Sequence, residues 1–545
     1  MRQRDCPRTA RAAAWPGTGA AAVLRLGFTA LWDLALRRAT LPFLVVVCAA
    51  CAVGPTYVRP SAPVPPKYRE VPPPEAAATE KWKEAQPQDG ARRGSWWEVF
   101  GDPALDALEE QVAGANQTLA QAEAAFRGAR ALARGARSSF FPTLSTVPSA
   151  TRSSGVATKA PGAPGVPAPT VTTYSVPVDL SWELDLFGRI RRSVEAGVAG
   201  AQASAAELEA VRLTLQAELA VDYFVLRGLD SEQQLLDSTV AAYQTALDLT
   251  TNRYKQGVVS GIDVAQAQTQ LESTRAQATD LSLTRAQLEH AIAVLVGKAP
   301  GEFAIAAQPA RVTPPVIPAG VPSDLLERRP DIAAAERLVA AANAQIGVAR
   351  AAYFPTLTLG ATGGYQSSTL SDFFSLPNRF WSLGPALAET LFNGGKRRAA
   401  SEQAVAAYDA SVAAYRQSVL TSFEEVEDNL AALRILAQEA EQQGAAVAAA
   451  ERMLRMAKNR YEAGITTYLE VVIAQSSALA NERVAVDLLS RRLAASVNLI
   501  KALGGGWRDS DLPGRSAVLQ RVSSPAGAAT ATPPTTPGPV AGASR

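Results

Sequence analysis

The sequence contains one structural unit twice, and this duplication limits the possible folds more than any other feature. Asn116–Leu144 aligns without gaps with Arg329–Leu357, and Asn252–Gly297 aligns in the same way with Asn459–Gly504. Both copies of the second block begin with Asn-Arg-Tyr and end with glycine. Because self-similarity at a fixed spacing is typical of a repeated unit, we expect two halves of about 210 residues with one topology.

Each half is expected to contain a helix, two strands and a long helical hairpin, in that order. Residues 190–255 and 396–461 have an uninterrupted helical pattern, which at 1.5 Å per residue corresponds to helices of about 100 Å. Leucine and valine recur on one face with coiled-coil spacing, and alanine, the strongest helix former, makes up about a fifth of the chain. Shorter helices over 261–297 and 467–503 complete the hairpins.

The expected strands alternate between apolar and polar side chains. They lie at about 140–150, 171–187, 354–366 and 379–392. A membrane-spanning β-strand needs this alternation, because one of its faces contacts lipid and the other contacts water. In the second strand, the residues expected to face lipid are Tyr174, Val176, Val178, Leu180, Trp182 and Leu184.

Four strands cannot span a membrane alone, because the unpaired groups at open strand edges find no hydrogen-bond partners in lipid. Two copies of the chain would give a barrel filled by its own side chains, whereas three copies would give twelve strands around a lumen. Asp179, Glu183 and Asp185 on the polar face require water. The strands therefore favour a trimer with a shared β-barrel.

The N-terminal region is typical of a secretion signal. Arg37 and Arg38 precede an apolar run at 41–47, and small residues follow. The run is shorter than the roughly 20 residues of a membrane-spanning helix. Ala49-Ala50-Cys51 resembles the lipobox of bacterial lipoproteins, which implies acylation of Cys51 after cleavage. A signal peptide without a lipid and a redox-active Cys-x-x-Cys pair remain alternatives.

Composition and pattern divide the chain into five segments. Residues 1–50 are expected to be a signal or start region, 51–80 a lipid-anchored proline-rich tether, 81–310 the first repeat with the hairpin 190–297, 311–508 the second repeat with the hairpin 396–503, and 509–545 a disordered tail.

Composition also excludes several classes of function. The 53 basic and 51 acidic residues nearly cancel, so the chain lacks the charge expected of a nucleic-acid-binding protein. One histidine and three cysteines exclude a histidine-rich metal site, a disulfide scaffold and a zinc-finger array. No serine–histidine–aspartate, cysteine–histidine or paired-carboxylate arrangement stands out. We therefore expect no enzymatic activity, no metal ligands and no cofactor, apart from covalent lipid on Cys51.

Several motifs occur in a characteristic order. They are Cys51-Ala-Val-Gly-Pro-x-Tyr-x-Arg-Pro60, Trp96-Trp-x-x-Phe-x-Asp-Pro-x-Leu105, Arg328-Arg-Pro-Asp-Ile332 and the two Asn-Arg-Tyr-x-x-Gly blocks. Together with the duplication, they resemble the TolC-like outer membrane factor family, specifically its NodT-type efflux lipoproteins. The resemblance covers about residues 51–505 of the chain.

This resemblance implies a mainly α fold with membrane β-structure: a duplicated long-helix α-barrel and four strands per chain that contribute to a trimeric twelve-stranded β-barrel. The implied function is passive conduction of exported drugs and toxic compounds across the periplasm and the outer membrane of a Gram-negative bacterium. The implied partners are two further copies of the chain, a periplasmic adaptor, an inner-membrane RND-type pump and outer-membrane lipid, with no nucleic acid.

The turns at Gly257 and Gly464 join helices whose other ends lead to the strands, so both turns are expected at the periplasmic tip. The resemblance implies that these tips form a closed entrance, with polar links between the coiled coils and an acidic ring. Asp263 and Glu470 stand at the matching positions, and Tyr461 is a tip partner. Helix termination by the glycines, and a helix-start role for Glu470 favoured by the helix dipole, remain alternatives.

Other functions also remain open. An outlet for type I secretion or metal efflux would have the same fold. A periplasmic coiled-coil adaptor or structural protein would also have helical hairpins, but would lack two sets of alternating strands. A periplasmic enzyme would need a catalytic constellation that the sequence does not show.

Overall fold

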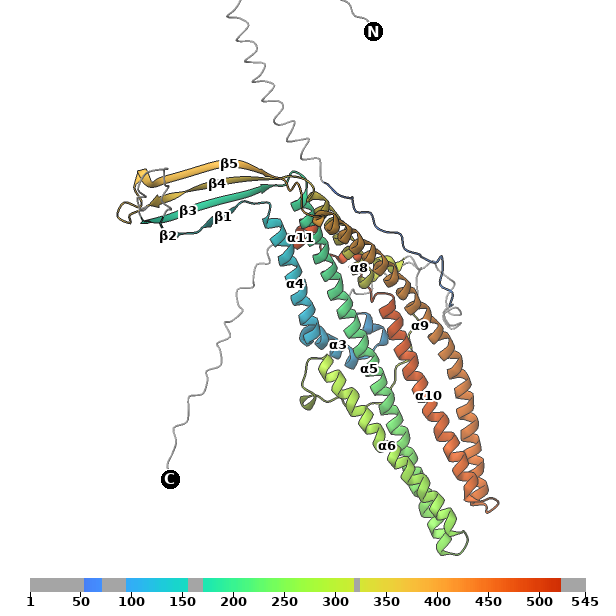
Figure 1. Ribbon diagram of the computed structural model, residues 1–545. Coiled ribbons are helices and arrows are strands. Elements are labelled where there is room, and N and C mark those ends of the chain that lie inside the picture. Colours follow the sequence, from blue (N-terminus) through green and yellow to red (C-terminus); the bar gives the residue numbers. More distant parts are fainter. Residues whose placement is uncertain (1–52, 71–94, 155–169, 318–323, 521–545) are drawn as a thin grey trace, which may run out of the picture. The chain divides into compact units, whose positions relative to one another are not determined.

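The computed structural model describes residues 53–70, 95–154, 170–317 and 324–520 (Figure 1). Cys51 and the expected signal region lie outside the described residues. The chain divides into a unit that contains the strands and a unit that contains most of the helices. Among the described residues, the sheet unit comprises residues 53–54, 139–154, 170–192 and 347–398, and the helical unit comprises residues 55–70, 95–138, 193–317, 324–346 and 399–520.

The sheet unit combines strands of both repeats in one antiparallel sheet. The strands are β1 (Thr143–Thr146), β2 (Ser149–Ser154), β3 (Thr170–Leu184), β4 (Thr356–Ser367) and β5 (Arg379–Ala388). Their order is β1–β3–β4–β5, and β2 also pairs with β3. Because β1 and β2 follow one another along β3, the sheet is four strands wide, with β1 and β2 at one edge and β5 at the other.

The register of the sheet places apolar and polar side chains on opposite faces. Leu180 pairs with Ala361, which pairs in turn with Leu383 on β5. The six residues expected to face lipid lie on this Leu180 face, because they are alternate residues of β3. On the opposite face, the Thr362 hydroxyl donates a hydrogen bond of 2.7 Å to the Asp179 carboxylate.

Two acids of the polar face also fix the start of the next helix. The Asp185 carboxylate accepts the backbone N–H groups of Ile190 and Arg191 at 2.9 and 2.8 Å. The Arg189 guanidinium donates two hydrogen bonds to the Glu183 carboxylate, at 2.9 and 2.6 Å. The sequence predicted only a water-facing position for these acids. Asp185 also binds backbone N–H groups that the helix start leaves without partners, and Glu183 binds the side chain of the first helical residue.

The helical unit is built from two hairpins of very unequal helices (Figure 1). The helices are α5 (Arg189–Lys255) and α6 (Gly261–Leu295) in the first repeat, and α9 (Lys396–Glu462) and α10 (Tyr468–Ala502) in the second. Both long helices have 67 residues, which corresponds to about 100 Å. Their bounds lie within one or two residues of the expected ones. Within the described part of the chain, no helix is both long and apolar enough to cross a bilayer.

Shorter elements complete both units. They are η1 (Trp96–Phe100), α3 (Pro103–Ala115), α4 (Gln117–Ser138), η2 (Pro300–Glu302), α7 (Leu325–Arg328), α8 (Pro330–Ala351), η4 (Leu376–Asn378), η5 (Asp509–Asp511) and α11 (Arg515–Leu519).

The single helix expected before the strands of the first repeat is divided in two. The Ala-rich run from 104 to 139 forms α3 and α4, which are separated at Asn116. The Asn116 side chain accepts the Leu119 N–H at 3.0 Å and donates to the Leu295 carbonyl at 2.8 Å. It therefore caps α4 and also binds the end of α6. These bonds explain why the expected helix is interrupted at Asn116.

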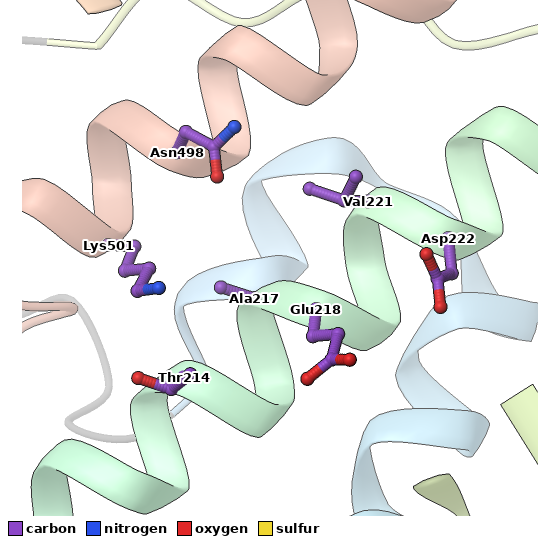
Figure 2. Close-up of a pocket in the computed structure, with 7 residues that line it drawn as sticks. All are labelled: Thr214, Ala217, Glu218, Val221, Asp222, Asn498 and Lys501. Atoms are coloured by element: carbon purple, nitrogen blue, oxygen red, sulfur yellow. The ribbon is translucent and has the colours of Figure 1, made fainter. Parts of the chain in front are cut away.

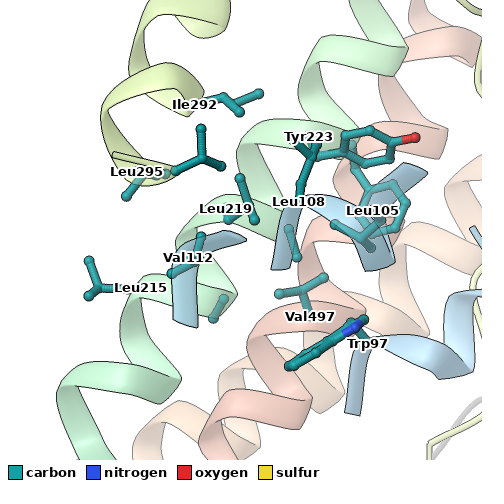
Figure 3. Close-up of a cluster of buried hydrophobic side chains, with 14 of the residues drawn as sticks. Trp97, Leu105, Leu108, Val112, Leu215, Leu219, Tyr223, Ile292, Leu295 and Val497 are labelled. Carbon is teal, nitrogen blue, oxygen red and sulfur yellow. The ribbon is translucent and has the colours of Figure 1, made fainter. Parts of the chain in front are cut away.

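The largest hydrophobic cluster lies where α3 packs against the hairpin helices (Figure 3). Its buried members include Leu105, Leu108 and Val112 of α3, Leu215, Leu219 and Tyr223 of α5, Ile292 and Leu295 of α6, Val497 of α10, and Trp97. The α10 contribution means that this cluster joins the two repeats.

The described part of the expected tether, residues 55–70, is extended and bound along the helical unit. The Pro55 carbonyl accepts the Asn343 amide at 3.2 Å, and the Ser61 carbonyl accepts the Arg416 guanidinium at 3.2 Å. Glu70 forms an ion pair with Arg434 at 2.6 Å. These contacts anchor a segment that sequence analysis interpreted only as a tether.

The expectation of a disordered tail from residue 509 is wrong for residues 509–520. These residues form η5 and α11, and Val518 of α11 is fully buried. Arg130 of α4 donates to the backbone carbonyls of Ala517 and Gln520 at 2.7 and 3.3 Å. Composition alone does not predict this order, because the order depends on contacts with residues distant in the sequence, such as Arg130 and Gln202. The rest of the tail lies outside the described residues.

Candidate functional site

Both hairpins end in the same kind of turn at the tips shown in Figure 1. Gly257 and Gly464 have φ angles of +76° and +73°. The Gly257 N–H donates to Tyr254 O and the next N–H donates to Arg253 O, both at 2.9 Å. The same two bonds recur after α9. This is the Schellman pattern, in which a left-handed residue satisfies the last carbonyls of a helix, and glycine adopts that conformation without steric cost.

The two tip acids have different partners. The Asp263 carboxylate accepts the N–H and the hydroxyl of Ser260, each at 2.9 Å, and so completes a capping box at the start of α6. The N-cap residue of α10, Thr467, makes no side-chain cap bond. Glu470 instead forms an ion pair of 3.6 Å with Arg460, and both side chains are about half exposed. Of the two acids, Glu470 is therefore the one that presents its charge to solvent.

Arg253 of α5 joins the two hairpins at their tips. Its guanidinium donates to the backbone carbonyls of Tyr461 and Glu462, each at 3.0 Å, and lies 4.8 Å from the centre of the Tyr461 ring. The Tyr461 hydroxyl also lies 3.4 Å from the Thr250 hydroxyl. The sequence indicated Tyr461 as a tip residue but not Arg253, although Arg253 is the central residue of the repeated Asn-Arg-Tyr motif.

A small apolar cluster stabilises this link. The rings of Tyr461 and Tyr468 pack edge to face with centroids 5.2 Å apart. Val471 and Ala267 are buried in the same cluster. Burial raises the pKa of Tyr468 to about 12, so its hydroxyl stays protonated at any physiological pH. Around the cluster, large apolar side chains are exposed, namely Tyr254, Val258, Ile262, Ile465, Leu469 and Ile473.

Further polar contacts join the hairpins away from the tips. The Gln270 amide of α6 donates to the Ser476 hydroxyl of α10 at 3.2 Å. Arg483 of α10 binds the Glu232 carboxylate of α5 at 2.6 Å and donates to Gln277 of α6 at 3.1 Å. Polar contacts therefore join the two hairpins both at their tips and farther along their helices.

A polar cavity between α5 and α10 does not resemble a ligand pocket. It has a volume of about 230 Å³ and is lined by Thr214, Ala217, Glu218, Val221, Asp222, Asn498 and Lys501 (Figure 2). Drug-sized ligands occupy mostly apolar cavities of about 300–1,000 Å³. Burial, and then the Glu218 charge, raise the pKa of Asp222 to about 6. Among the described residues, no cluster of three or more histidine, cysteine or acidic side chains is arranged to hold a metal ion.

The fold and the tips together define a class of protein: a duplicated pair of helical hairpins with linked tips, attached to a sheet with one apolar face. The family model described as outer membrane efflux protein matches residues 108–298 and 321–505. The chain therefore belongs to the outer membrane efflux protein family, which is a family of channels and not of enzymes.

Known relatives match nearly the whole chain. The toluene efflux pump outer membrane protein TtgF of Pseudomonas putida is 33% identical over 472 residues, which are 85% of this chain and 96% of TtgF. Outer membrane protein OprJ of Pseudomonas aeruginosa is 32% identical over 482 residues, or 88% of this chain and 97% of OprJ. The solved outer-membrane channel OprN has a TM-score of 0.74 and 31% identity, and the match covers 84% of this chain and 100% of OprN.

These similarities confirm the expected family, fold class and location. The chain is an outer-membrane channel of a Gram-negative efflux system that extends into the periplasm.

Proposed function

We propose that three copies of this chain form one channel through which small organic compounds leave the cell passively. The features of the sheet provide the main support for this proposal. It is four strands wide, it has one apolar face, and its β1–β2 and β5 edges are unpaired in the described chain. In lipid, closure with further copies satisfies those edges. Three copies supply twelve strands, which leave a lumen for the polar face that contains Asp179.

The lipid anchor would lie close to this sheet. The N–H of Val53 donates to the Phe187 carbonyl at 3.1 Å, directly after β3, and Phe187 stacks on Phe354 with ring centroids 4.8 Å apart. Cys51 is two residues before Val53, a span of at most about 7 Å. We propose that acylated Cys51 inserts into the leaflet next to the sheet, where Tyr174 and the other five residues of its face contact lipid.

The proposed partners follow from the family and from the shape of the helical unit. A passive channel needs an energy source elsewhere, so we propose an inner-membrane RND-type pump and a periplasmic adaptor that contacts the tips. Relatives that are 31–33% identical are named for toluene, solvent and antibiotic efflux. We propose small apolar compounds of this kind as substrates, with neither catalysis nor a cofactor. An apolar face on a wide sheet favours this function over a soluble periplasmic adaptor.

The linked tips would form the gate. Arg253 and Tyr461 hold α5 to α9, so the tips open only when these contacts break. Glu470 carries an exposed charge at the same tip, partly balanced by Arg460. Three copies of Glu470 around one axis would repel one another and attract cations.

Conductance across a planar lipid bilayer tests the proposed function. Protein purified from outer membranes should produce discrete conductance steps with a preference for cations. Glu470→Ala should weaken that preference, whereas Glu272→Gln, which removes an exposed charge farther along α6, should leave it unchanged. Protein that inserts but conducts no ions would contradict the channel, and an unchanged preference in Glu470→Ala would remove Glu470 from the gate.

A further inference from the structure

The connections of the chain identify the outer end of the sheet. β3 leads into α5 directly after Leu184, and β5 leads into α9. Because these long helices form the periplasmic part of the channel, the opposite ends of the strands lie toward the outside of the cell. The connection between β4 and β5, residues 368–378, is therefore on the outer side of the membrane.

Aromatic side chains mark the outer limit of the apolar face. Tyr365 lies on this face, because it pairs directly with Val176. Phe373 and Phe374 of the β4–β5 connection pack against Tyr365, with ring centroids 6.3 and 5.5 Å from its centroid. Membrane β-barrels have aromatic girdles at the level of the lipid headgroups. This cluster therefore indicates the headgroup level of the outer leaflet.

Two arginines lie on the same face at or beyond this level. Arg379, the first residue of β5, pairs directly with Tyr365. Arg152 of β2 pairs with Thr172, which is two residues farther outward along β3 than Tyr174. Directly opposed residues share a face of the sheet, so both arginines lie on the lipid-facing side.

The charges of this face are not balanced within the chain. Both arginines are exposed, and neither side chain makes a hydrogen bond or ion pair with the described residues. The described strand residues of this face include no acid. Asp372, the acid of the β4–β5 connection, forms no ion pair within the described part of the chain. The outer rim of the lipid-facing side is therefore positively charged.

We propose that Arg152 and Arg379 bind the phosphates of lipid A, the anionic glycolipid of the outer leaflet. A guanidinium donates paired, charge-assisted hydrogen bonds to a phosphate. The apolar stem of an arginine lies along apolar surface while its charged end reaches the headgroups. Clusters of basic side chains at a membrane surface recognise anionic lipids in this way.

The inference rests on the proposed trimeric channel. Arg152 lies on one edge of the sheet and Arg379 on the other, and closure of the barrel joins these edges. Each boundary between two copies then carries one arginine from either side on its lipid-facing surface. A trimer therefore has three such sites.

Native mass spectrometry with lipid A as the probe tests this inference. The detergent-solubilised parent trimer should bind up to three lipid A molecules. Arg152→Gln/Arg379→Gln should bind lipid A at least about tenfold more weakly, because it removes two charge-assisted contacts. Arg152→Lys/Arg379→Lys keeps both charges and should bind better than the glutamine variant. Arg127→Gln/Arg452→Gln, which removes two exposed arginines from α4 and α9, is the matched control and should bind as the parent does.

The lipid-binding outcomes are separate from the assembly outcomes. Equal binding by the parent and the glutamine variant would overturn the site, as would equal binding of lipid A and its dephosphorylated form. Displacement of lipid A by a large excess of inorganic phosphate would indicate a site for free phosphate instead. A trimer without bound lipid A would overturn the site but leave the channel intact. A monomer that binds lipid A through these arginines would overturn the trimer and retain lipid recognition.

Discussion

Arg253 and Arg460 occupy equivalent places in the two repeats but bind different partners. Arg253 donates to two carbonyls at the end of α9, whereas Arg460 forms a half-exposed ion pair with Glu470 in its own hairpin. An exposed ion pair contributes little to stability. Bonds from a charged donor to carbonyls of another helix, together with ring contact, contribute more. Within one chain, Arg253 therefore contributes more than Arg460 to holding the two hairpin tips together.

Replacing Arg253 should open the tip. Arg253→Ala removes two hydrogen bonds and the contact with the Tyr461 ring, so the mean conductance in a planar bilayer should rise at least twofold. Arg452→Ala, which changes an exposed arginine of α9, is the matched control and should leave the conductance as it is. Equal conductance of all three proteins would show that Arg253 does not restrain the gate.

Glu109 of α3 is a second residue with an unusual environment, which determines its protonation state. It is fully buried, and neither carboxylate oxygen has a hydrogen-bond partner. Burial, and then the Asp106 charge, raise its pKa to about 9. The folded chain therefore keeps Glu109 protonated between about pH 4.5 and 9, whereas the unfolded chain ionises it. The free energy of unfolding falls as the pH rises through this window.

Glu109→Gln should raise the melting temperature of the purified protein at pH 8, because it removes the cost of keeping the carboxyl protonated. That cost is about 1.4 kcal/mol per pH unit above 4.5, taken as an upper limit. Below pH 4.5 the two proteins should melt together, since both states then hold the proton. Thermal melts at pH 4 and pH 8 test this, and a gain of the same size at both values would refute the ionisation argument.

At the scale of elements, periodicity in the sequence was sufficient to locate the long helices and three of the four expected strands, whereas the strand expected at about 140–150 is the two short strands β1 and β2. The strand alternation also placed Tyr174, Val176 and their neighbours on one face, as the register shows. The breaks were harder to predict. Asn116 ends a helix through a bond to Leu295, a residue distant in the sequence. The order of α11 depends on Arg130 in the same way.

The candidate site was predicted only in part, for a related reason. The alignment of the repeats makes Asp263 and Glu470 equivalent, but Asp263 binds Ser260 at the start of its own helix, whereas Glu470 pairs with Arg460 of the preceding helix. Arg253 acts on the other repeat, and no local pattern in the sequence indicates such a contact. Residues that act within one turn of a helix are predictable here, whereas residues that join two repeats are not.

Two glycines that follow helix ends allow the energetic cost of a positive φ angle to be separated from the energetic cost of a steric clash. Gly464 and Gly504 both have positive φ, at +73° and +93°. An added Cβ would meet nothing within 4 Å at Gly464, but would lie 2.1 Å from the Arg328 carbonyl oxygen at Gly504. Gly464→Ala should therefore cost about 1–2 kcal/mol of local strain.

Gly504→Ala should lower the melting temperature clearly more than Gly464→Ala does, because the Arg328 backbone must move as well. Thermal melts of the two purified variants beside the parent protein provide the measurement. Equal melting temperatures of the two variants would mean that the contact with Arg328 does not constrain the fold.

At the scale of the whole molecule, a single chain leaves sheet edges and apolar surface without partners. One sheet has two open edges, one apolar face and strands from both repeats. The long hairpins are linked at their tips, and alanines on α4 and α9 are exposed in the single chain. The proposed trimer would provide partners for both the strands and the helices, with twelve strands and three pairs of repeats.

Native mass spectrometry of the protein solubilised from outer membranes tests this central claim most directly. We expect a complex with three times the mass of the mature chain, and each chain should carry an acyl-sized increment on Cys51. A trimer without the increment would retain the channel and remove only the lipid anchor. A lipid-free monomer recovered from the soluble periplasm would contradict the trimeric channel.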